Sequence, residues 1–196
     1  MEKDRLLAFS DGVIAIIVTI MVLQLTTPAA PRPDALLKLA PILLSYALSF
    51  LVVAIMWVNH HHLVHAVKHV SARLLWSNIN LLFWMSLIPF VTDYLGRFHR
   101  EPFPVALYGL DLGMCGLAFT ILRSELVQQH SRDPEMAEYH SRMQMKNVMA
   151  TGMYLAAAAL AYATIYFSYA IYVAIPLLYF LPERKLAERP KTISQE

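Results

Sequence analysis

One long uncharged stretch of the chain, residues 39–67, constrains the fold more than any other feature. It contains no Asp, Glu, Lys or Arg and is mostly apolar. A helix that crosses the hydrocarbon core of a bilayer needs about 20 such residues, so a run of this length is typical of a transmembrane helix. The whole chain is also poor in charge: 15% of its residues are charged, against about 25% in a soluble domain. We interpret the sequence as a multi-pass membrane protein.

Six apolar runs predict an all-α membrane protein with six transmembrane helices, forming a single transmembrane channel domain over residues 1–196. The expected spans are residues 6–25, 39–67, 74–95, 103–123, 147–166 and 169–182. Cytoplasmic loops carry an excess of Lys and Arg. Six spans place 12 of the 16 Lys and Arg residues on the side that holds both termini and 4 on the other, whereas five spans give 8 on each side. We therefore expect both termini to be cytoplasmic.

Composition also excludes some classes of partner and chemistry. The net charge of +2 is too small for a nucleic-acid partner to be expected. The single Cys115 excludes a disulfide within the chain. No nucleotide-binding loop or ligand-binding domain is visible, so we expect no enzyme activity and no cofactor.

The first expected span has two different faces. Taking 100° per residue, one stripe runs down the helix and consists of Arg5, Phe9, Gly12, Ile16, Thr19, Ile20 and Leu23. From periodicity alone, this stripe is an ordinary lipid-facing or packing surface. Asp11 lies 140° from the stripe centre. An ionisable residue within a span is costly and indicates a partner on another helix, and the polar candidates include the histidines of the second span and the asparagines of the third.

Several motifs resemble the signature of the transmembrane protein 175 (TMEM175) potassium-channel family. In chain order they are Arg5-x-x-x-Phe9-Ser10-Asp11, Trp57-x-x-His60, and Asn78 eleven residues before Pro89. The size of the chain and its short loops resemble the single-repeat prokaryotic members. The resemblance covers most of the chain, and its specific motifs lie in the first three expected spans.

The resemblance implies a potassium-permeable cation channel without a Thr-Val-Gly-Tyr-Gly filter, in a prokaryotic cell membrane. A homotetramer would place four first helices around one path for potassium ions, with protons or other monovalent cations as further permeant ions. The implied constriction is Ile16, Ile20 and Leu23, with Thr19 on its flank as a selectivity candidate. The implied interhelical bracing residues are Arg5, Phe9, Ser10, Asp11, Trp57, His60 and Asn78, with Asp11 accepting from His60, Trp57 or Asn78.

Two alternatives remain open. The histidine cluster between His60 and His69 has members at i, i+4 and i+8, namely His61, His65 and His69, a spacing that suits zinc. No Asp or Glu lies between residues 41 and 92, so the usual carboxylate base is missing, and we expect no metal site. The second alternative is a secondary transporter or proton-conducting pathway that uses Asp111 or the histidine cluster.

Overall fold

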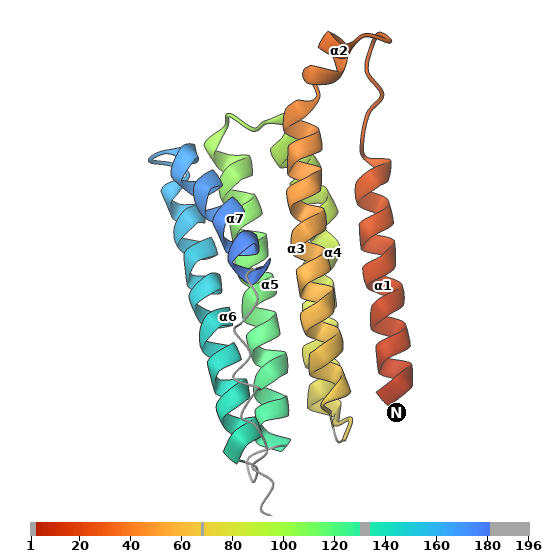
Figure 1. The fold of residues 1–196 in the computed structure, drawn as a ribbon, viewed down its shortest axis with the longest axis vertical. Coiled ribbons are helices and arrows are strands. Elements are labelled where there is room, and N and C mark those ends of the chain that lie inside the picture. Colours follow the sequence, from red (N-terminus) through yellow and green to blue (C-terminus); the bar gives the residue numbers. More distant parts are fainter. Residues whose placement is uncertain (1–2, 68, 130–133, 181–196) are drawn as a thin grey trace, which may run out of the picture.

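The structure, a computed structural model, describes residues 3–67, 69–129 and 134–180 and is built from α-helices throughout these ranges (Figure 1). The helices are α1 (Lys3–Leu23), α2 (Pro33–Leu37), α3 (Ala40–His65), α4 (Ala72–Arg97), α5 (Pro102–Gln129), α6 (Pro134–Leu160) and α7 (Ile165–Phe180). The short helix α2 lies in the proline-rich connection between α1 and α3. Each of the first four expected spans overlaps one long helix.

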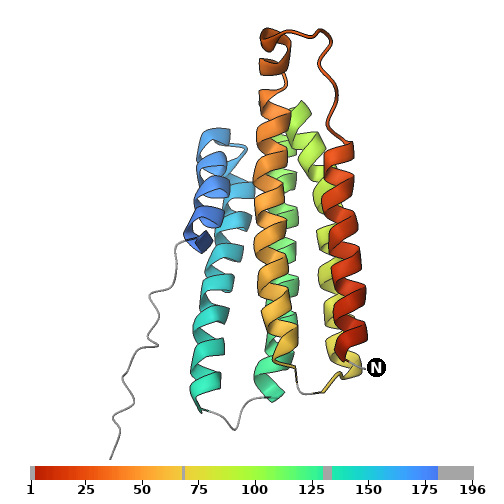
Figure 2. The same ribbon diagram turned by 45° about the vertical axis from the view of Figure 1, so that its right-hand side comes forward.

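The long helices form one elongated bundle with α4 and α5 at its centre. Helix α1 packs against α3 and α4, α4 packs against α5, and α5 packs against α6 and α7. The two views show α1 on one side of the bundle and the α6–α7 pair on the other (Figures 1 and 2). Many of the most deeply buried side chains, such as Leu81, Met85 and Tyr108, come from α4 and α5.

The sequence accounts for several helix boundaries. Helix α4 begins after Ser71, whose hydroxyl accepts a hydrogen bond from the backbone N–H of Leu74 at 3.1 Å, an N-cap that satisfies one of the first free N–H groups. Helix α5 begins at Pro102, where the missing N–H has no intrahelical partner to lose. Pro89 and Pro176 lie inside α4 and α7.

The expected count of six transmembrane helices is wrong. In the part of the chain that the structure describes, four helices are long and apolar enough to cross a membrane, namely α1, α3, α4 and α5. The expected span at 147–166 is the end of α6, which starts in a polar stretch, stops at Leu160 and is followed by a turn. The expected span at 169–182 falls on α7, and its last two residues lie outside the described ranges. With 16 residues, α7 is about 24 Å long, less than the roughly 30 Å of a bilayer core.

Side chains of α6 and α7 pack directly against glycines of α5. A Cβ added at Gly113 would lie 2.5 Å from Leu155 of α6, and one added at Gly109 would overlap the hydroxyl of Tyr172 of α7. That hydroxyl donates to the carbonyl of Val105 at 2.8 Å. Small residues of this kind let membrane helices pack closely.

Candidate functional site

Helix α1 has one face buried against its own chain and one face left open. The buried face consists of Leu6, Leu7, Ser10, Ile14, Ile17 and Met21. The open face is the stripe defined from the sequence, and its apolar members are well exposed: Ile16 is 58% exposed, Ile20 42% and Leu23 80%. The Thr19 hydroxyl donates to the carbonyl of Ile16 at 2.8 Å. The residues predicted for the constriction and its flank therefore share one exposed face of the single chain.

A buried chain of hydrogen bonds connects α1, α4 and α3. The amide nitrogen of Asn78 donates to the Ser10 hydroxyl at 2.9 Å, and this hydroxyl donates to the carbonyl of Leu6 at 2.9 Å. The amide oxygen of Asn78 lies 2.7 Å from Nε2 of His60. With this amide orientation the imidazole is the donor, because the amide oxygen can only accept. Ser10, His60 and Asn78 are each fully buried.

Asp11 takes part in a separate contact nearer the surface. The indole N–H of Trp57 donates to its carboxylate at 2.9 Å, which joins α1 to α3. Of the three donors left open by the sequence, the structure therefore pairs Asp11 with Trp57 and pairs His60 with Asn78. Arg5 and Phe9 are exposed and lie on the open face of α1, so the structure separates these two from the other residues predicted to brace the helix.

The histidines at the end of α3 lie close together but do not form a metal-binding group. The rings of His61 and His65 are 4.3 Å apart between centroids. Among the described residues, no group of three or more His, Cys, Asp or Glu side chains has the geometry to hold a metal ion. The N-terminal end of α1 reaches this region, where Lys3 donates to the carbonyl of His65 at 3.2 Å.

Asp111 lies apart from these residues, within α5. It is 4% exposed, and neither carboxylate oxygen has a hydrogen-bond partner in the described part of the chain. One turn earlier, the Tyr108 hydroxyl lies 3.0 Å from the Ser49 hydroxyl, which accepts from Thr92 at 2.7 Å. This buried polar cluster links α3, α4 and α5. Sequence reasoning missed it, because single hydroxyl residues in apolar helices give no signal of their own.

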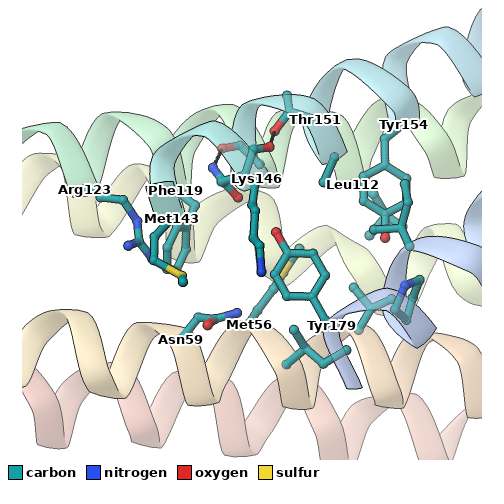
Figure 3. A pocket seen from close by; sticks show the side chains of 17 residues that line it. Met56, Asn59, Leu112, Phe119, Arg123, Met143, Lys146, Thr151, Tyr154 and Tyr179 are labelled. Carbon is teal, nitrogen blue, oxygen red and sulfur yellow. Dashed lines mark hydrogen bonds between the residues drawn. The ribbon is translucent and has the colours of Figure 1, made fainter. Parts of the chain in front are cut away.

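Sequence reasoning also missed a cavity between α3, α5, α6 and α7 (Figure 3). It has a volume of about 60 Å³. Its polar lining includes Asn59, Arg123, Lys146 and Tyr179, and its apolar lining includes Leu112 and Ile175. The only available signal was the position of Arg123 and Lys146 at the edges of apolar runs. That position shows where each cation lies along its own helix. It does not show that α5 and α6 place the two cations in the wall of the same cavity.

The helices and their buried polar contacts define a multi-pass α-helical membrane protein. The model of a protein family described as the endosomal/lysosomal potassium channel TMEM175 matches residues 5–89. A protein from Chryseobacterium sp. (strain P1-3), named a potassium channel, is 38% identical over 192 residues, covering 97% of this chain and 99% of that protein. The chain belongs to the TMEM175 family.

Two further relatives extend the comparison. The human endosomal/lysosomal proton channel TMEM175 is 31% identical over 115 residues, which cover 52% of this chain and 23% of the human protein. The crystal structure of a lysosomal potassium-selective channel TMEM175 homolog from Chamaesiphon minutus has a TM-score of 0.79 and 24% identity, covering 92% of this chain and 97% of that one. This likeness supports the fold.

Proposed function

We propose that this chain forms a potassium-permeable cation channel whose ion path is lined by the first helix of each subunit in a homotetramer. The proposal draws on the relatives named potassium channels and on one structural observation. The open face of α1 is a continuous stripe of apolar side chains that no other described helix of the chain covers. One chain supplies one such helix, so a central path requires several copies related by rotational symmetry.

The proposed constriction is formed by Ile16, Ile20 and Leu23. A ring of branched aliphatic side chains closes a path to ions by excluding water, and a small widening of the ring lets water and ions through. Thr19 flanks this ring, and its hydroxyl oxygen keeps accepting capacity while the hydrogen is donated to the helix backbone. Because the sequence has no Thr-Val-Gly-Tyr-Gly filter, we propose a modest preference for potassium over sodium.

The buried hydrogen bonds have a positioning role in this proposal. Ser10 and Asp11 lie on the side of α1 that faces α4 and α3, where they contact Asn78 and Trp57. These directional contacts fix the rotation of α1 about its own axis. The stripe is then held facing away from its own chain, where the stripes of other copies can meet it.

Ion flux into liposomes tests the proposed path. With the full chain reconstituted, potassium flux should exceed sodium flux, and Ile16→Asn should raise both and reduce their ratio, because a polar side chain wets the constriction. Val22→Asn is the matched control: Val22 is 45% exposed on the same helix but lies 120° from the stripe centre at 100° per residue. Equal effects of the two substitutions would show that α1 does not line the path. Saturable flux that requires a counter-ion would indicate a transporter instead.

Cross-linking tests the assembly. The single native cysteine, Cys115, is buried, so an added thiol is the main reactive group. A cysteine in place of Ile16 should form disulfide-linked dimers on mild oxidation, because first helices meet around the proposed axis. A cysteine in place of Val22 should cross-link much less. Failure of the Ile16→Cys variant to cross-link in a protein that conducts potassium would contradict the central position of α1.

A further inference from the structure

The cavity between α3, α5, α6 and α7 has two positively charged side chains in its wall. Lys146 extends from α6 across the cavity toward Asn59 and Tyr179, and Arg123 extends from α5 beside Phe119 and Met143 (Figure 3). The guanidinium carbon of Arg123 lies 5.4 Å from the centre of the Phe119 ring. Among the residues that line the cavity, all of them in the described ranges, none is acidic. The lining therefore favours an anionic group.

The rest of the lining is mostly apolar, with a few neutral polar side chains such as Asn59 and Thr151. Figure 3 shows Arg123 toward one side, Lys146 in the middle and Leu112 and Tyr154 toward the other side. The volume of about 60 Å³ exceeds the roughly 10–15 Å³ that one water-sized group needs. A phosphate group, with four oxygens each about the size of a water molecule, fits within the volume of the cavity.

A groove on the outside of the bundle continues from this cavity. It has a volume of about 280 Å³ and shares Ile55, Asn59 and Tyr179 with the cavity wall. Its other lining residues, Ala54 and Val58, are apolar. Because these belong to α3, a helix long and apolar enough to cross the membrane, the groove lies at a depth where lipid acyl chains surround the protein.

We propose that this cavity and groove together bind one anionic phospholipid, with its phosphate near Lys146 and Arg123 and an acyl chain along the α3 side of the groove. Basic pockets between transmembrane helices are a known type of headgroup site, and long cationic side chains at the edge of an apolar helix turn toward the polar boundary of the bilayer. The proposed site uses α3, α5, α6 and α7 and leaves the open face of α1 to the ion path.

Native mass spectrometry of the full-length protein tests the proposal by counting bound molecules after addition of phosphatidylglycerol, phosphatidylcholine or inorganic phosphate. The wild-type protein should retain phosphatidylglycerol in preference to phosphatidylcholine, and inorganic phosphate should not displace it. Lys146→Met should weaken this binding about fivefold, the effect of one nearby Lys or Arg on an anionic lipid, and Lys146→Arg should preserve it. Lys38→Met is the matched control. Lys38 is exposed and follows α2 in the connection between α1 and α3, outside the lining of the cavity and groove.

A second pair of variants tests the apolar part. Val58→Phe narrows the groove and should weaken phosphatidylglycerol binding, whereas Val22→Phe, at an equally exposed position on α1, should not. Equal phosphatidylglycerol binding to the wild-type and Lys146→Met proteins would overturn the proposal. A second subunit that covers the groove would also overturn it. Equal losses in Lys146→Met and Lys38→Met would indicate general charge attraction, and displacement by inorganic phosphate would indicate a free-anion site. Either result also overturns it.

Discussion

Helices α1, α3 and α4 are joined by hydrogen bonds between side chains. Helices α5, α6 and α7 are joined by close contact at glycines and by hydrogen bonds that mostly end on backbone carbonyls. In the first region, Asn78 of α4 bonds to Ser10 of α1 and His60 of α3. In the second, Gly109 and Gly113 of α5 lie directly under side chains of α7 and α6. Both regions are tightly packed, so the difference lies in the kind of contact and not in its extent.

The two kinds of contact control different aspects of helix geometry. A hydrogen bond requires its donor and acceptor at a set distance and angle, so it fixes how a helix is rotated about its axis. A glycine in contact with a neighbouring side chain sets how closely two helices approach. The rotation of α1 decides which face it presents outward, and the hydrogen-bonded region is the one that the family model matches, at residues 5–89.

The largest expected effect comes from removing the central amide. Asn78→Ala leaves the buried Ser10 and His60 side chains without their shared partner, at a cost of about 1–3 kcal/mol for each unsatisfied group. We expect a loss of about 3 kcal/mol in the free energy of unfolding, measured by denaturant titration in detergent. Asn80→Ala, at a half-buried position on another face of α4, should cost far less. A double-mutant cycle with His60→Ala should show coupling, and strict additivity would contradict the proposed link.

The second effect probes the close-packed region. In Gly109→Ala the new methyl group overlaps the fully buried Tyr172 and breaks its hydrogen bond to Val105. Overpacking of this kind costs about 2 kcal/mol, which a thermal shift assay in detergent should detect. Gly12→Ala is the control, because an added Cβ there meets nothing within 4 Å, so it should be neutral or slightly stabilising. If both variants melt like the wild type, glycine contacts do not set the spacing of α5 and α7.

A smaller effect is expected at the edge of the hydrogen-bonded region. Asp11→Ala removes the acceptor of the Trp57 indole N–H, and Trp57 is 42% exposed, so its N–H regains part of its hydrogen bonding elsewhere. We expect a loss of about 1 kcal/mol and a smaller oligomer fraction on size-exclusion chromatography. Trp57→Phe should give a similar loss, and the double variant should lose no more than either single one. A fully assembled, normally conducting Asp11→Ala protein would contradict the bracing role.

The smallest effect is expected at Asp111. An ionised carboxylate is costly to bury without a partner, and neither of its oxygens has one among the described residues. Asp111→Asn keeps the shape and breaks no hydrogen bond among the described residues, so we expect the variant to be at least as stable as the wild-type protein and potassium flux into liposomes to be unchanged. Loss of flux in a stably folded Asp111→Asn protein would favour the transporter or proton pathway over the channel.

The sequence was sufficient for the apolar helices and for the two faces of α1, because length, charge and the helical period determine them. The sequence was not sufficient to identify the hydrogen-bond partner of Asp11. Trp57 and His60 are one turn apart on the same side of α3, so spacing alone does not decide which one reaches α1. The count of six transmembrane helices failed where α6 and α7 divide one long uncharged run, because where a helix stops inside such a run depends on packing.

The shortness of α7 affects how much membrane area the protein occupies at each depth. This helix starts at the end of the bundle away from the N-terminus and stops partway along it (Figures 1 and 2). It therefore adds to the cross-section of the bundle in one half of the membrane only. We therefore expect the two leaflets to accommodate different protein areas, with lipid molecules closer to the flanks of α3 and α6 in the half without α7.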